Sequence, residues 1–261
     1  YLITNEEAEA VTLAILMHDI GHGPFSHALE NSIVTGISHE EISLLFMERL
    51  NEEFDGKLDL AISVFKDEYP KRFLYQLVSS QLDMDRLDYL RRDSFFTGVS
   101  EGVVGSDRII KMLHVVNDEL AIAHKGIYSI EKFIEARRIM YWQVYLHKAV
   151  LSAENLLTQI LKRAKELAKR GDDVFATPSF KRFLTSDFTV EDFRNDPSVL
   201  NDFSKLDDFD VLTCIKVWAE EAEPVLAELS KYLVNRKLLK VVFLDQPKSD
   251  AVMNVLLDEL K

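Results

Sequence analysis

The chain has 261 residues, which is enough for one large domain or two modest ones. Its 47% hydrophobic and 29% charged residues are ordinary for a soluble globular protein, and its formal net charge of −13 argues against broad nonspecific binding to nucleic acid or to an anionic membrane. No apolar run approaches the roughly 18 residues that span a bilayer, and the first residues do not resemble a signal peptide. The single cysteine, Cys214, excludes an internal disulfide, so we expect a cytoplasmic protein.

Helical spacing dominates the first part of the chain. We predict a helix over residues 6–17 and a second over 39–50, capped by Ser38 with Glu41 three residues later. A third helix is predicted over 73–93.

The middle of the chain mixes helices with one extended segment. A helix is predicted over 106–114, where a Ser-Asp pair suits an N-terminal cap, and a short strand over 120–124, followed by a turn. Residues 129–170 are expected to form one long helix or two in series, stopped by Gly171.

After Gly171 the composition changes. Residues 175–208 are predicted as short helices joined by loops, and 211–229 as an amphipathic helix interrupted by Pro224. The apolar run 238–244 favours a strand, and the following helix is predicted over 249–261 as part of a βα unit. The fold class expected is therefore mainly α, with a helical core over 1–150 and a smaller C-terminal α(+β) lobe over 151–261.

The most informative segment is residues 18–27, which read His-Asp-Ile-Gly-His-Gly-Pro-Phe-Ser-His. Imidazole and carboxylate together suit a divalent transition metal and can also transfer protons to and from a phosphate ester. The glycines permit close turns around a site. The alternative is a helix end with a few exposed histidines.

A second cluster of charges covers residues 82–93, which read Leu-Asp-Met-Asp-Arg-Leu-Asp-Tyr-Leu-Arg-Arg-Asp. On a helix, Asp85, Tyr89 and Asp93 share one face. A solvated charged face explains the pattern equally well. Asp85 is a candidate because His18 and Asp19 need a distant partner to complete a metal's ligand set.

A third pattern places Arg137, Tyr141, Tyr145 and Lys148 on one helical face, at i, i+4, i+8 and i+11. Two cations and two phenols in a stripe suit a phosphate chain with a sugar or base. Tyrosines that pack under extended cationic side chains are the alternative.

Together these segments resemble the HD-domain phosphohydrolase superfamily, and most closely its deoxynucleoside triphosphate (dNTP) triphosphohydrolase branch, which includes dGTPase-like enzymes. The resemblance covers roughly residues 10–150. It implies an all-helical catalytic core and a divalent metal (Mn, Fe, Mg, Ni or Zn). It makes His18, Asp19 and Asp85 metal ligands.

The resemblance also implies roles around the reacting phosphate. His22 and His27 match positions near the scissile phosphate, and His39 matches a histidine that passes a proton to the leaving group. Glu30 replaces an acid that supports the catalytic histidine.

The same resemblance suggests how a substrate is held. The residues that match contacts to the phosphates and the deoxyribose are Arg86, Tyr89, Asp93, Arg137 and Tyr145, and the stripe adds Tyr141 and Lys148. One family feature is missing: members carry a further ligand histidine upstream of the His-Asp pair, and no histidine precedes His18. We expect that the segment with this histidine is absent from the chain; the alternative is a divergent protein without the full ligand set.

The function expected is metal-dependent hydrolysis of dNTPs to deoxynucleoside and inorganic triphosphate. Alternatives are another HD phosphohydrolase, acting on a nucleoside monophosphate, an alarmone or a cyclic dinucleotide, or a noncatalytic module that senses nucleotides. Relatives form homo-oligomers, so a homo-oligomer is expected here; some relatives are activated by a dNTP effector, and the sequence leaves open whether this chain is. No membrane partner is expected, and nucleic acid is a less favoured one.

Overall fold

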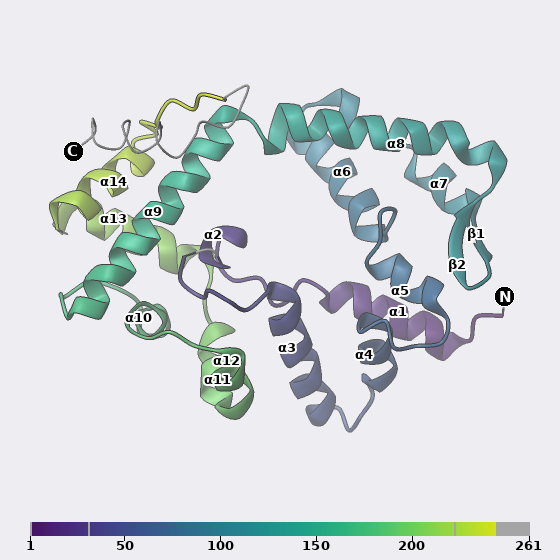
Figure 1. Cartoon of the computed structure of the whole chain (residues 1–261), viewed down its shortest axis with the longest axis horizontal. Coiled ribbons are helices and arrows are strands. Elements are labelled where there is room, and N and C mark those ends of the chain that lie inside the picture. Colours follow the sequence, from purple (N-terminus) through teal and green to yellow (C-terminus); the bar gives the residue numbers. More distant parts are fainter. Residues whose placement is uncertain (1, 31, 222, 244–261) are drawn as a thin grey trace, which may run out of the picture.

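The computed structural model describes residues 2–30, 32–221 and 223–243, and over these residues it is mainly helical with one two-stranded sheet (Figure 1). The first seven α-helices are α1 (Asn5–Met17), α2 (His27–Glu30), α3 (His39–Glu53), α4 (Asp59–Phe65), α5 (Arg72–Val78), α6 (Met84–Thr97) and α7 (Ser106–Met112). The others are α8 (Ile127–Met140), α9 (Lys148–Arg170), α10 (Pro178–Thr185), α11 (Val190–Asn195), α12 (Pro197–Phe203), α13 (Asp208–Glu221) and α14 (Pro224–Val234). The strands are β1 (Leu113–Val116) and β2 (Glu119–Ile122), which pair antiparallel. The predicted mainly α fold class is confirmed.

Local signals in the sequence fix several helix ends. The predicted cap of α3 is present as a capping box: the Ser38 hydroxyl accepts from the Glu41 N–H at 3.2 Å, and the Glu41 carboxylate accepts from the Ser38 N–H. Gly171 ends α9 in the left-handed region at φ +90°, which glycine adopts without steric cost. Prolines occupy the first turns of α10, α12 and α14.

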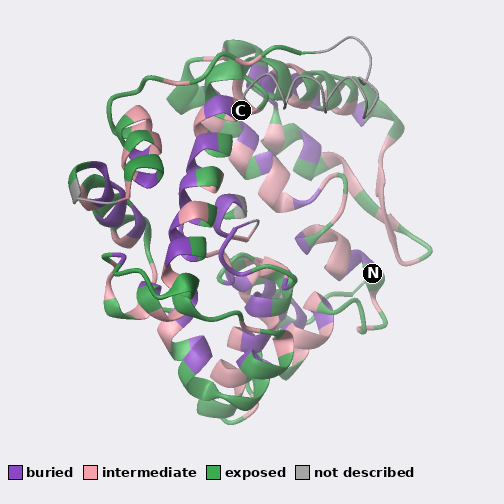
Figure 2. Cartoon of the chain, turned by 60° about the vertical axis from the view of Figure 1, so that its left-hand side comes forward, coloured by how far each residue is buried: buried purple, intermediate pink, exposed green. Residues whose placement is uncertain are grey.

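Within residues 2–30, 32–221 and 223–243, the buried side chains form three hydrophobic clusters, and most helices carry buried residues along one side only (Figure 2). The first lies between α1, α4 and α5, and the second between α6, α7 and α8. The third joins α9 to α14 with residues 28–45. The boundary near residue 150 stays a prediction, but α2 and the first turns of α3 pack with the C-terminal helices. None of the described helices is both long and apolar enough to cross a membrane.

The predicted helix over 73–93 is wrong as a single element. Helix α5 ends at Val78, and α6 begins at Met84 after a turn. Asp83 holds this turn, because its carboxylate accepts hydrogen bonds from the N–H groups of Ser80 at 3.0 Å and Arg86 at 2.8 Å. Asp83 is therefore an N-cap rather than a mid-helix residue.

One neighbouring prediction also needs correction, and another is confirmed. Helix α7 ends at Met112 because the next residues form β1, and the residue before it, Gly105, provides no side-chain cap. For residues 129–170 the second of the two predicted alternatives is confirmed, because they form two helices in series. A π-helical turn over Tyr141–Tyr145 and a break at Leu146 and His147 separate α8 from α9.

The strand predicted over 238–244 is not formed by residues 238–243, which have no strand partner in the part of the chain that the structure describes. An isolated apolar run cannot satisfy its backbone groups as a strand without such a partner. Leu244 and the helix predicted over 249–261 lie outside the described residues.

Candidate active site

The end of α1 supplies the first two site residues. His18 is the C-terminal cap of α1, and its Nδ1 lies 2.7 Å from the Ile15 carbonyl oxygen. This contact orients the ring, because Nδ1–H donates to the carbonyl and Nε2 is turned toward Asp19 Oδ2 at 3.2 Å. A backbone carbonyl that orients a histidine in this way is a common feature behind metal-ligating imidazoles.

The segment after Asp19 turns closely over the start of α3. The Gly21 N–H donates to Ser43 Oγ at 2.8 Å in a buried contact. A Cβ at position 21 would lie 2.1 Å from the His39 carbonyl oxygen, so only glycine fits there without movement of α3. The motif glycine thus brings the Asp19 segment against His39.

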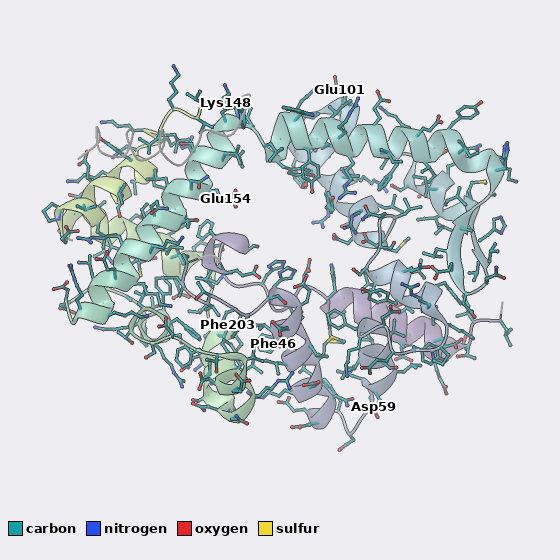
Figure 3. The ribbon with its side chains drawn as sticks, viewed as in Figure 1. Phe46, Asp59, Glu101, Lys148, Glu154 and Phe203 are labelled. Atoms are coloured by element: carbon teal, nitrogen blue, oxygen red, sulfur yellow. The ribbon has the colours of Figure 1, made fainter. Side chains whose placement is uncertain are left out.

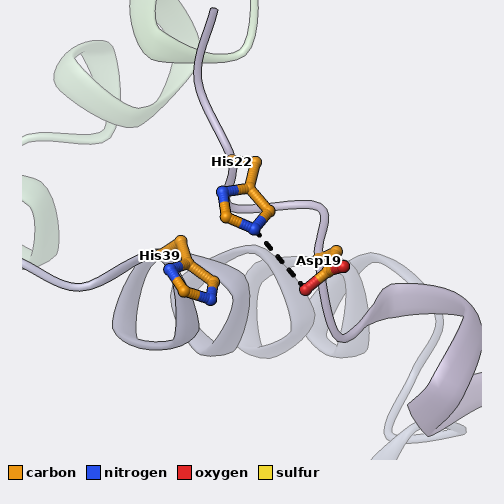
Figure 4. Close-up of side chains that lie close together, drawn as sticks. All are labelled: Asp19, His22 and His39. Carbon is orange, nitrogen blue, oxygen red and sulfur yellow. Dashed lines mark ion pairs between the residues drawn. The ribbon is translucent and has the colours of Figure 1, made fainter. Parts of the chain in front are cut away.

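This close approach stacks the rings of two histidines, His22 and His39. The rings of His22 and His39 lie 3.9 Å apart between centroids and 16° from parallel, and His22 Nε2 lies 3.7 Å from Asp19 Oδ1 (Figure 4). Glu30 Oε2 is 3.5 Å from His39 Nδ1, and Glu40 Oε1 is 3.3 Å from His39 Nε2. The carboxylate of Glu30 is therefore placed to orient His39.

Asp85 enters from the first turn of α6. Its carboxylate lies with one ligand atom each of His18 and Asp19 in a group whose atoms are all within 4.8 Å of one another. Asp19, His22 and His39 form a second such group. One imidazole and two carboxylates suit a divalent transition metal, so the residues present fit the metal that the sequence implied.

The charges of His18 and Asp19 in the first group stabilise each other. A hydrogen bond with Asp19 raises the pKa of His18, and the same bond lowers the pKa of Asp19. Burial raises the pKa of Asp85, for which the described residues supply no comparable hydrogen-bonded partner. Asp85 thus carries a partly desolvated carboxylate that a cation would stabilise.

This group lines one wall of a cavity of about 370 Å³. The lining residues that had been predicted as site residues are His18, Asp19, His39, Asp85, Arg86, Tyr89, Arg137 and Tyr141. A hollow of similar size at the end of α9, about 430 Å³, is lined by Asp172, Lys181 and Trp218 among others but by no histidine. The chemistry therefore points to the cavity beside His18.

Both cavity arginines are held in place by their neighbours. The Arg86 guanidinium donates to the Asp83 carboxylate and to the Ser80 carbonyl. Arg137 donates to the Gln81 side-chain oxygen at 3.1 Å and lies over the Tyr141 ring at 5.7 Å. These contacts fix two cations in the lining of the cavity, one from α6 and one from α8.

Two predicted tyrosines and one predicted aspartate contact one another beside the arginines. The Tyr89 and Tyr145 rings meet edge to face at 6.1 Å, and the Tyr145 hydroxyl donates to Asp93 Oδ2 at 2.6 Å. Burial and this bond to Asp93 raise the pKa of Tyr145, so the phenol stays protonated. Tyr89 lines the cavity, whereas Tyr145 and Asp93 do not. Tyr145 packs against the Tyr89 ring and is held by Asp93.

Lys148 is not brought to this cavity. The break at Leu146 and His147 interrupts the predicted stripe, and Lys148 starts α9 with its Nζ 5.4 Å from the centre of the Phe243 ring (Figure 3). His27 begins α2, but its side chain lies outside the described part of the structure.

Sequence reasoning missed several supporting residues. Asp83, which holds Arg86, carries a recognisable N-cap signal. Ser43, Tyr75 and Gln81 have no local signal, because their contacts with Gly21, the cavity and Arg137 arise only in the folded chain.

Comparison with known proteins places this site in a family. An HD domain matches residues 2–90, and an HD-associated region matches residues 104–176. A solved phosphohydrolase from Bacteroides thetaiotaomicron is 56% identical with a TM-score of 0.94, and the match covers 100% of this chain and 64% of that one.

Two curated relatives are similar over much of the chain. The uncharacterized protein YwfO of Bacillus subtilis is 34% identical over 91% of this chain and 54% of its own length. The deoxynucleoside triphosphate triphosphohydrolase SAMHD1 homolog of Dictyostelium discoideum is 29% identical over 66% of this chain and 37% of its own length. The chain thus spans about half the length, or less, of these relatives. With the His-Asp pair, the distant Asp85 and the helical core in place, the chain is a member of the HD-domain superfamily.

Proposed function

We propose that the protein is a metal-dependent phosphohydrolase that converts a dNTP to deoxynucleoside and inorganic triphosphate. The observation that carries the proposal is the shared cavity. It joins the group of His18, Asp19 and Asp85 to two fixed arginines and Tyr89. A cavity of about 370 Å³ has room for a nucleotide's sugar and phosphates. The similarity to the deoxynucleoside triphosphate triphosphohydrolase homolog of Dictyostelium discoideum supports a dNTP as substrate.

The metal would be held by His18, Asp19 and Asp85. When bound, such an ion supplies Lewis acidity to a phosphate oxygen and lowers the pKa of water. Arg86 and Arg137 then offset negative charge on the phosphate chain, because both guanidiniums are fixed before substrate arrives.

Hydrolysis at the α-phosphorus forms a bond from the water oxygen to phosphorus and breaks the bond from phosphorus to the 5′ oxygen. The departing 5′ oxygen needs a proton, and His39 is the residue that we assign to supply it. Glu30, 3.5 Å from His39 Nδ1, holds the ring in orientation, and His22 stacks against its face. His27 stays a predicted neighbour of the phosphate.

Recognition of deoxyribose is assigned to the aromatic side of the cavity. Tyr89 would crowd the 2′ position, so that a ribose hydroxyl has no room. Asp93 and Tyr145 hold Tyr89 from behind. Tyr141 lies against Arg137 and completes this wall. Homo-oligomerisation, activation by a dNTP effector and the native metal stay predictions.

The test is turnover of each dNTP and NTP with Mn²⁺, followed by chromatography of the products. Asp85→Ala should lower turnover by at least about 100-fold, since a metal contributes several kcal/mol to such reactions. Asp88→Ala is the matched control, because Asp88 lies on the same helix but is exposed and paired with Arg92. Turnover of a monophosphate or a cyclic dinucleotide alone would favour another HD substrate. No turnover and no bound metal would favour a sensing module.

A further inference from the structure

The turn that follows His22 is strained. Phe25 and Ser26 have φ values of +52° and +45°, so two consecutive residues with side chains adopt the left-handed region that favours glycine. Within the turn, the Ser26 N–H donates to the Gly23 carbonyl at 2.9 Å. A turn of this kind persists only where surrounding contacts hold it.

One such contact comes from a C-terminal helix that is distant in sequence. The Phe25 N–H donates to Asp208 Oδ1 at 2.8 Å, across 183 residues of sequence. Asp208 is the first residue of α13, beyond both segments that match the HD family. A carboxylate that accepts from a backbone N–H makes a charge-assisted bond, which is stronger than one between neutral groups.

The same C-terminal helices touch the motif at further points. Phe203 of α12 lies under Gly23, where an added Cβ would come within 3.1 Å of the Phe203 ring. It also meets Phe46 of α3 at 6.4 Å between ring centroids (Figure 3). Lys165 of α9 donates to the Ile33 carbonyl. Gly23, Phe25 and Ile33 are thus each contacted by residues of the C-terminal helices.

We propose that Asp208 is a positioning residue for the active site: it fixes the strained turn at Phe25 and Ser26, and through it His22. The inference rests on the proposed function for its catalytic consequence. His22 lies three residues before Phe25, and its ring reaches both Asp19 and His39. If the Phe25 N–H loses its acceptor, the turn relaxes toward negative φ and moves the His22 ring off His39. Misplacement on the scale of 1 Å is enough to lower a rate strongly.

The experiment compares Asp208→Ala with Asp208→Asn, which keeps an oxygen acceptor at the same place without the charge. Asp210→Ala is the matched control, because Asp210 caps the same helix through the Asp207 N–H and does not contact the motif. For dNTP hydrolysis, Asp208→Ala should lower kcat by about tenfold or more with KM within about twofold. The kcat of Asp208→Asn should stay within about threefold of the wild-type value, and the kcat of Asp210→Ala should equal the wild-type value.

A second readout does not depend on activity. Stacking against His39 shifts the ring proton resonances of His22, and NMR should show this shift lost in Asp208→Ala and kept in Asp208→Asn and Asp210→Ala. Equal kcat in Asp208→Ala and wild type, or an equal loss in all three variants, would overturn the proposal.

If the wild type hydrolyses no dNTP, the proposed function fails, and the ring shifts alone decide the role of Asp208. Unchanged shifts in Asp208→Ala would then overturn it. Should Asp208→Ala not fold, Asp208→Ser takes its place, because its shorter side chain also withdraws the acceptor from Phe25.

Discussion

The close approach of Gly21 to α3 predicts that a single added methyl group destabilises the fold. In Gly21→Ala the new Cβ would lie 2.1 Å from the His39 carbonyl oxygen and 2.4 Å from the Ser43 nitrogen, whereas real Cβ contacts essentially never fall below 3.0 Å. Both obstacles are backbone atoms of α3, so no side-chain rotation relieves the overlap. The N-terminal end of α3 must move away from the motif.

The expected loss follows from two effects. Overpacking a well-filled site costs about 1–3 kcal/mol. Separation of the segments also removes the buried hydrogen bond from Gly21 to Ser43, which contributes about 1 kcal/mol. We therefore expect Gly21→Ala to lower the free energy of unfolding by about 2–4 kcal/mol, and turnover to fall because His39 moves with α3.

The assay is urea unfolding followed by circular dichroism, with Gly105→Ala as the matched control. A Cβ at Gly105 would meet its nearest atom only at 4.0 Å, so this variant should unfold at the wild-type urea concentration. The Gly21→Ala midpoint should fall by about 1 M. Equal midpoints for Gly21→Ala and the wild type would refute the reasoning.

Three further predictions test other parts of the structure. Tyr89→Ala should reduce the preference for dNTP over NTP by about tenfold or more, measured as the ratio of kcat/KM values; an unchanged ratio would remove Tyr89 from sugar selection. Tyr145→Phe withdraws the donor to Asp93 and should lower the free energy of unfolding by about 1–2 kcal/mol, and wild-type stability in urea would argue against that bond. Lys71 and then Tyr69 hydrogen-bond to Glu7 and lower its pKa to about 2 from the usual 4.5. Because the folded pKa is depressed, Glu7 stabilises the fold fully above about pH 4.5 and loses this effect as the pH falls toward 2. Glu7→Gln should therefore be less stable than the wild type at pH 7, with a gap in urea midpoint that closes between pH 4.5 and 2; a gap independent of pH would contradict the assignment.

The parts of the fold that sequence could predict depend on local signals. The capping box of Ser38 and Glu41 and the left-handed Gly171 act within a few residues, and both mark helix ends as predicted. The turn at Asp83 also carries a local signal, but the surrounding helical spacing obscured it. The run 238–243 shows the reverse case, since a strand needs a partner that its own residues do not specify.

The site divides in the same way. The adjacent ligand candidates His18 and Asp19 stand out in sequence, whereas Asp85 was one candidate on a charged helix until the family resemblance made it a ligand, and the fold brings it to Asp19 across 66 residues. Helical periodicity alone predicted that Lys148 shares a face with Arg137. The π-helical turn over Tyr141–Tyr145 breaks that periodicity, so Lys148 does not lie on this face in the structure. The contact between Phe25 and Asp208 depends on packing between distant helices, so no spacing rule could reveal it.

The most direct measurement of the central claim is hydrolysis of a dNTP in ¹⁸O-labelled water with Mn²⁺, with mass spectrometry of both products. Attack at the α-phosphorus predicts one ¹⁸O atom in inorganic triphosphate and none in the deoxynucleoside. Label in the deoxynucleoside, or products consisting of a deoxynucleoside monophosphate and pyrophosphate, would contradict the account.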